Sequence, residues 1–220
     1  MAVDVSREMA IVAVMLLLYT YLWFAAKFLY AYNKNRENTI LGGIMLTFTF
    51  FFIGRLVLVV YDYYLTVLDY AQFETYIWWW KIGILLHGFG FGVLCLVVER
   101  QLFEGRDHYV FFLGFVVFNI LMLLAPDYPS AQTFQIVAFL FTAFIPFGYI
   151  RIAMTSKGEF RKRAIYAISG FLVFVVVSFM MINPVVVFFG TVLNVSQYLV
   201  LVISSCGQIV AAALIAKGYL

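Results

Sequence analysis

Four ionisable side chains occur in or beside two long apolar stretches between residues 40 and 100: Arg55, Asp62, Lys81 and His87. A charged group at membrane depth is costly and usually faces a cavity or an ionic partner. A guanidinium matches the oxygens of carboxylates and phosphates, and an imidazole titrates or donates a hydrogen bond near neutral pH. We therefore predict that these residues bind a small ligand. Arg55 would bind its anionic group, and His87 would form the floor of the site.

The spacing places these side chains in the outer half of one helical hairpin. Arg55 lies 15 residues after Ile40, about 22 Å along a helix, and so in the outer third of a core about 30 Å thick. Asp62 follows seven residues later, on nearly the same helix face but about 10 Å further along the axis. We expect the two to share a polar stripe without pairing easily. Lys81 and His87 follow a run of three tryptophans that marks the outer boundary.

Structural roles for the same residues stay open at this stage. Lys81 can extend its ammonium to the lipid head groups. Arg55 can do the same or bind a carbonyl of a neighbouring helix, and His87 can hydrogen-bond between helices. No second histidine or carboxylate stands at metal-ligand spacing from His87, so the sequence predicts neither a metal nor another cofactor.

The composition predicts an integral membrane protein. Of 220 residues, 65% are hydrophobic and only 11% are charged, whereas soluble domains carry about 25% charged residues. A chain of this size cannot bury so much apolar surface in its own core, so lipid must solvate it. The net charge of +3 is spread over short loops, which excludes a nucleic-acid partner. No catalytic pair or motif is present, and an enzyme is not predicted.

Seven apolar stretches predict an all-α bundle of seven transmembrane helices that forms a single domain over residues 1–220. A spanning helix needs about 20 apolar residues, and the fourth stretch is the shortest. The predicted spans are 9–32, 40–63, 76–98, 109–125, 132–153, 163–182 and 193–216. The first and last three share a pattern, a basic loop followed by a glycine-containing helix, which suggests a 3+1+3 repeat.

Lysine and arginine occupy every second loop of this arrangement. The basic residues are Lys34, Arg36, Arg100, Arg106, Arg151, Lys157, Arg161, Lys162, Arg163 and Lys217. The alternate loops, 64–75, 126–131 and 183–192, contain none. Because basic loops stay on the cytoplasmic side, we predict a multi-pass protein of the cell membrane, with its N-terminus outside and its C-terminus in the cytoplasm.

The predicted cytoplasmic ends offer a second set of candidate residues. Glu99 and Arg100 end the third helix, and Arg161, Lys162 and Arg163 form the most basic loop. We predict that these residues contact a cytoplasmic partner or anionic lipid; a role as topology anchors is the alternative. The apolar segment 183–194 extends the last helix, lies along the interface or re-enters the membrane, and the sequence does not decide among these.

No motif assigns the chain to a family, so its function is inferred from the polar hairpin alone. The first hypothesis is a receptor-like sensor that binds a small anionic or lipidic ligand outside and signals through a separate cytoplasmic partner. The second is a small-solute transporter in which the same pocket alternates its access. The third is an accessory or structural subunit of a larger membrane complex, with its apolar helix faces as contact surfaces.

Overall fold

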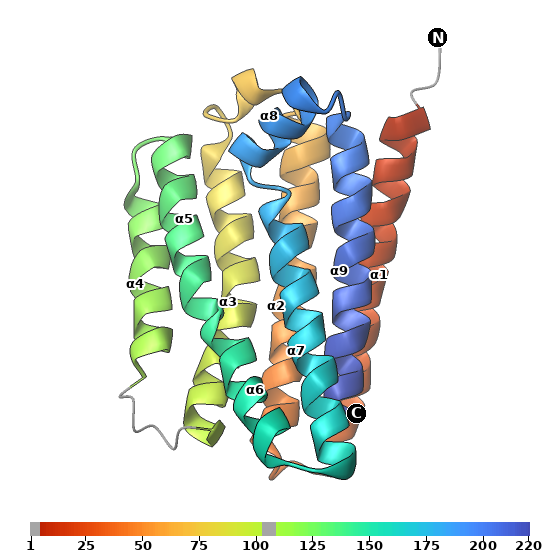
Figure 1. Cartoon of the computed structure of the whole chain (residues 1–220). Coiled ribbons are helices and arrows are strands. Elements are labelled where there is room, and N and C mark those ends of the chain that lie inside the picture. Colours follow the sequence, from red (N-terminus) through yellow and green to blue (C-terminus); the bar gives the residue numbers. More distant parts are fainter. Residues whose placement is uncertain (1–4, 103–108) are drawn as a thin grey trace. The chain divides into compact units, whose positions relative to one another are not determined.

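The computed structural model describes residues 5–102 and 109–220, and all regular structure within them is helical (Figure 1). The α-helices are α1 (Val5–Lys34), α2 (Thr39–Val59), α3 (Ile77–Leu102), α4 (Val110–Leu124), α5 (Tyr128–Thr142), α6 (Phe144–Thr155), α7 (Gly158–Phe179), α8 (Asn183–Val192) and α9 (Gln197–Tyr219). A π-helix, η1 (Val60–Leu65), continues α2, and a short 3-10 helix, η2 (Tyr70–Gln72), follows it. Of the basic residues used to predict orientation, Arg106 lies outside the described residues.

Within the described residues, six helical segments are long and apolar enough to cross a membrane. They confirm an all-helical, multi-pass membrane protein. The segments are Ser6–Lys34, Thr39–Leu65, Ile77–Arg100, Tyr128–Thr155, Gly158–Phe179 and Gln197–Tyr219. The fourth predicted span forms α4, which has only 15 residues and falls short of the usual length.

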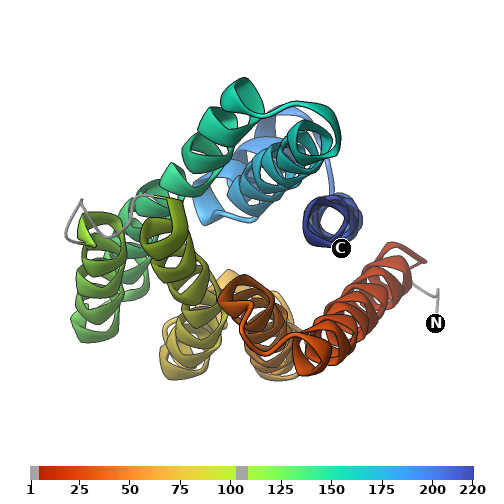
Figure 2. The same cartoon turned by 90° about the horizontal axis from the view of Figure 1, so that it is seen from below.

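The chain divides into two compact units. One comprises residues up to Thr20 together with Tyr149–Leu220, and the other comprises Tyr21–Gly148. In the second unit α2 and α3 lie side by side, as do α4 and α5 (Figure 2). Their helices form where the sequence predicted them because long apolar runs must satisfy their backbone groups internally when lipid is the solvent.

Glycines let α2 and α3 pack unusually closely. A Cβ atom at Gly54 would lie 2.4 Å from the backbone nitrogen of His87, and one at Gly90 would lie 2.8 Å from the carbonyl oxygen of Thr47. The Thr47 hydroxyl donates a hydrogen bond of 3.0 Å to the Gly90 carbonyl across the same contact. The backbone of α3 beside His87 is thereby fixed against α2.

The helical segment Tyr128–Thr155, which contains the fifth predicted span, is divided near its middle into α5 and α6. The α5 helix ends at Thr142 and α6 begins at Phe144, with Ala143 between them. Pro146 lacks an N–H donor, and its ring would clash with the carbonyl of Thr142 in a continuous helix. The interruption therefore follows directly from the proline.

In the other unit, small residues join α7 to α9. The Ser204 hydroxyl donates a hydrogen bond of 2.9 Å to the carbonyl of Val177. Gly207 faces the side chain of Val177, and Gly170 faces Ile215 on α9. Ser204 and Gly207 thus hold two helices together, as small and polar residues do in membranes.

The apolar segment whose conformation the sequence left open forms a separate short helix. Residues 183–192 form α8, and α9 begins only at Gln197. Val187, Phe188 and Val192 on α8 are exposed. The segment is therefore a distinct element and not an extension of the last helix.

Candidate ligand-binding site

The guanidinium of Arg55 is buried but incompletely bonded. The residue is 4% exposed, and its Nη1 atom lies 3.9 Å from an oxygen of Asp62. Among the residues that the structure describes, Nε and Nη2 have no hydrogen-bond partner. An unsatisfied buried donor costs free energy, and more so when it is charged. Arg55 therefore has two charged donors that an additional hydrogen-bond acceptor would satisfy.

Asp62 reaches Arg55 because α2 does not end as a regular α-helix. Asp62 lies in η1, whose wider turn is marked by the bond of 2.9 Å from the Thr66 N–H to the Tyr61 carbonyl. The changed rotation, together with the long arginine side chain, brings the two charges within 3.9 Å. The expectation that they would not pair easily assumed regular α-helical spacing and was wrong. Single π turns inside helices are frequent at functional sites.

Aromatic rings from three helices pack on one another near Arg55. The His87 ring on α3 stacks on Phe51 of α2, with centroids 4.4 Å apart and an interplanar angle of 12°. Tyr21 of α1 lies 6.3 Å from His87 and 5.5 Å from Phe51, between ring centroids. Arg55 interacts electrostatically with both Tyr21 and His87. The structure thus brings Arg55, Asp62 and His87 together and adds Tyr21, which the sequence did not single out.

Lys81 is directed to α4. It is 2% exposed, and its ammonium donates hydrogen bonds to the carbonyls of Leu123, at 3.1 Å, and Ala125, at 2.6 Å. These are carbonyls at the C-terminal end of α4, which have no partner within the helix. The ammonium also lies 4.7 Å from the ring of Trp78. Its hydrogen-bonding capacity is therefore used within the protein.

Glu99 occupies the matching position at the other end of α4. It is fully buried, at 0% exposure, and its carboxylate accepts hydrogen bonds from the backbone N–H groups of Phe111, at 2.7 Å, and Phe112, at 3.1 Å. A negative charge is favoured at a helix N-terminus and a positive one at a C-terminus. Two residues of α3, Lys81 and Glu99, therefore hold both ends of α4, and Glu99 presents no surface to a partner.

The other candidate cytoplasmic residues differ from Glu99 in exposure. Arg100, Arg161 and Lys162 are exposed. Arg163 is partly buried and lies 3.8 Å from the Glu159 carboxylate, one helical turn away. Exposed pairs of this kind contribute little stability. These basic side chains are accessible to water, lipid head groups or a partner.

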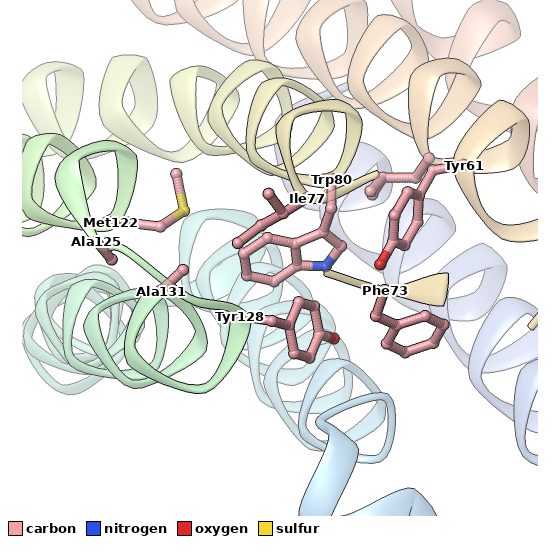
Figure 3. Packing of buried hydrophobic residues seen from close by; sticks show 9 residues of the cluster. Tyr61, Phe73, Ile77, Trp80, Met122, Ala125, Tyr128 and Ala131 are labelled. Carbon is pink, nitrogen blue, oxygen red and sulfur yellow. The ribbon is translucent and has the colours of Figure 1, made fainter. Parts of the chain in front are cut away.

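An aromatic cluster joins η1, the start of α3 and the start of α5 (Figure 3). Its ring centroids lie 5.6 Å apart for Tyr61 and Phe73, 5.3 Å for Phe73 and Tyr128, and 4.8 Å for Trp80 and Tyr128. The buried Tyr61 hydroxyl has no hydrogen-bond partner in the described part of the chain. From the sequence, Trp80 was noted only as part of the tryptophan run, because Phe73 and Tyr128 meet it only through folding.

The loop after η1 holds two strained residues. Val67 and Leu68 have φ angles of 51° and 59°, a conformation that a β-branched residue such as Val67 rarely adopts. Such strain clusters at functional sites because the surrounding structure must maintain it. It lies directly after the π-helix that carries Asp62, so both irregularities of this hairpin fall on one side of Arg55.

These features define a multi-pass helical membrane protein in which a buried cation, Arg55, lacks acceptors among the described residues. No protein-family model, curated protein or solved structure matches this chain. Three or more potential metal-ligating side chains do not gather anywhere in residues 5–102 and 109–220. The function is therefore argued from the Arg55 site itself.

Proposed function

We propose that this chain is a receptor-like membrane sensor that binds a small anionic ligand at Arg55. The observation that carries the proposal is the buried guanidinium with two nitrogens, Nε and Nη2, that lack an acceptor in the described residues. Asp62 and His87 complete the binding site from η1 and α3. An ionised group inside a membrane protein marks a functional site by default, and its incomplete bonding supports a ligand over a purely structural role.

The output of such a sensor would pass to a separate cytoplasmic protein or to anionic lipid. The exposed Arg100, Arg161 and Lys162 support this part of the proposal, since they are available for acidic groups. Glu99 is not included, because its carboxylate already caps α4. Lys81 is not included in the ligand site, because its ammonium already donates hydrogen bonds to carbonyls at the C-terminal end of α4.

Seven spans with an external N-terminus and a cytoplasmic C-terminus in the cell membrane belong to the same proposal. Lys81 and Glu99 are 18 residues apart on α3, about 27 Å along the helix. They bind opposite ends of α4, whose 15 residues extend over about 22 Å, so α4 crosses most of a hydrocarbon core about 30 Å thick. That geometry supports α4 as the fourth span and agrees with the alternation of basic loops.

A 3+1+3 repeat is supported by a shared packing device. The second and third spans, α2 and α3, meet through Gly54 and Gly90, and the sixth and seventh, α7 and α9, meet through Gly170 and Gly207. These are equivalent pairs in the proposed repeat. Close approach at small residues is a general feature of membrane helices. The glycine contacts support the repeat because they occur in equivalent helix pairs of its two halves.

The sensor proposal is tested by ligand-induced stabilisation of the purified protein. Chloride, phosphate, acetate and benzoate are titrated, and the melting temperature is followed in wild type and Arg55→Ala. A ligand at a hundred times its Kd stabilises by about 2.7 kcal/mol. We expect at least one anion to stabilise wild type but not Arg55→Ala, while Lys157→Ala, a loss of a different exposed cation, responds like wild type. Equal responses of wild type and Arg55→Ala to every anion would refute the site.

A transporter remains the second candidate because α9 also carries an unsatisfied polar group. The Ser205 hydroxyl is buried and without a hydrogen-bond partner in the described residues. Polar groups on both halves are what an alternating-access transporter requires. Uptake of the stabilising anion into proteoliposomes, lost in both Arg55→Ala and Ser205→Ala, would favour transport over sensing. An accessory subunit of a larger complex, the third candidate, predicts no response to any anion and stoichiometric co-purifying chains.

A further inference from the structure

The two nitrogens of Arg55 that lack a hydrogen-bond partner among the described residues lie on one edge of its guanidinium. Asp62 faces Nη1, and the two nitrogens without a partner in the described residues are Nε and Nη2. Nε and Nη2 lie on the same edge of the planar group, with N–H bonds that point in parallel. Two parallel donors match the two oxygens of a carboxylate in a bidentate contact.

We propose that the ligand is a monocarboxylate, held side-on by Nε and Nη2 of Arg55, and that one proton is taken up with it. This inference rests on the proposed function and specifies its ligand. The surroundings favour an apolar body behind the carboxylate, because the neighbouring rings of Tyr21, Phe51 and His87 are aromatic. A multiply charged anion such as phosphate would cost more to desolvate there.

The proton uptake follows from the ionisable groups around the pair formed by Arg55 and Asp62. Tyr21 of α1 and His87 of α3 interact electrostatically with Arg55, and Tyr61 of η1 interacts with Asp62. Arg55 and Asp62 balance each other, so a bound carboxylate adds a second negative charge to one cation. Two carboxylates sharing a low-dielectric site do not both remain ionised. A proton from bulk water that binds Asp62 turns its carboxylate into a neutral acid and restores the balance, with no bond formed or broken in the ligand.

The test compares binding of benzoate and octanoate with that of their neutral amides, benzamide and octanamide. The full chain is held in lipid nanodiscs at pH 7.5, 6.5 and 5.5, and binding is measured by calorimetry. Uptake of one proton strengthens binding by up to about tenfold for each unit of pH decrease, as long as Asp62 is ionised in the free protein and neutral in the complex. We expect both carboxylates, or one of them, to follow this dependence and the amides not to bind. Preference for octanoate indicates a lipid-derived carboxylate, and preference for benzoate indicates a water-soluble one.

Two variants test the bidentate contact of Arg55 and the proton uptake at Asp62 separately. Arg55→Lys keeps the positive charge but removes the parallel donors, so carboxylate affinity should fall by about tenfold or more. Asp62→Asn resembles the protonated aspartate, so it should bind at pH 7.5 as tightly as wild type does at pH 5.5 and should lose the pH dependence. If Arg55→Lys does not fold, Asp62→Asn alone still tests the proton.

The possible failures are distinguishable. Arg55-dependent stabilisation by chloride or phosphate, without carboxylate binding, overturns the ligand assignment and leaves the proposed function standing. Carboxylate binding that does not change with pH in wild type overturns the coupled proton. Carboxylate binding of the same strength in Arg55→Ala overturns both the inference and the proposed site.

Discussion

Two regions of the unit Tyr21–Gly148 differ in how completely their buried charges are hydrogen-bonded. Along α3 and α4, Lys81 donates to two backbone carbonyls and Glu99 accepts from two backbone N–H groups. Near the C-terminal end of α2, Arg55 has one carboxylate at 3.9 Å and two nitrogens without an acceptor in the described residues. All three side chains are at most 4% exposed, so burial alone does not distinguish them.

The difference lies in what each charge is used for. Lys81 and Glu99 satisfy helix ends that would otherwise be orphaned in an apolar environment, and each sign matches the end it binds. Arg55 satisfies no backbone group at Nε or Nη2 and is itself left short of acceptors. A buried charge with complete bonding is explained by the fold, whereas one with incomplete bonding calls for a ligand.

The largest expected effect comes from breaking the α3–α4 contact at Glu99. Glu99→Ala leaves two partly buried N–H groups without their acceptor, and we expect a loss of roughly 2–4 kcal/mol of unfolding free energy. The measurement is unfolding of the detergent-solubilised protein by denaturant. Arg100→Ala, the exposed neighbour, is the matched control and should change stability by less than about 0.5 kcal/mol. Similar values for the two variants would show that the cap does not stabilise α4.

An intermediate loss of stability, which a second substitution reverses, is expected at Arg55. Arg55→Met leaves Asp62 without its cation, and we expect a loss of roughly 1–2 kcal/mol, discounted because Asp62 is partly exposed. The double variant Arg55→Met, Asp62→Asn removes both charges and should return stability to within about 1 kcal/mol of wild type. The same unfolding assay checks both proteins. Failure of the double variant to recover would mean that Arg55 is structural, like Lys81 and Glu99.

The smallest effect concerns a helix cap that is exposed to water. Asp127 accepts a hydrogen bond of 2.8 Å from the Ser130 N–H at the start of α5, and that bond holds the pKa of the Asp127 carboxyl below its usual value. The stabilisation is therefore complete above the unfolded pKa, about 4, and is lost as pH falls through the lower folded pKa. Asp127→Asn keeps the cap but cannot titrate. Its melting temperature should fall less than that of wild type below pH 4. Parallel curves for the two proteins would show that this cap makes no pH-dependent contribution.

The positions of the helices followed from the sequence, but the roles of their charged residues did not. Apolar runs and basic loops were enough to predict helices at all seven stretches, because lipid requires every spanning segment to bond its own backbone. The segment 183–194 remained open, since its apolar composition fits several conformations. The sequence grouped Lys81 with Arg55 and Glu99 with Arg100 by proximity along the chain. Their partners on α4 are 42 or 44 residues away for Lys81 and 12 or 13 for Glu99.

Composition and apolar runs alone predicted that lipid solvates this protein, that its class is helical and that one hairpin concentrates ionisable side chains. Which of those charges are already satisfied became visible only in the folded chain. Hydropathy is a local property that sums along the chain, and it can therefore be read from the sequence without the fold. Hydrogen-bond satisfaction depends on which helix ends meet which side chains, and at Arg55 on a π turn that changes the direction of Asp62. That distinction separates the residues that hold the bundle together from the one proposed to bind a ligand.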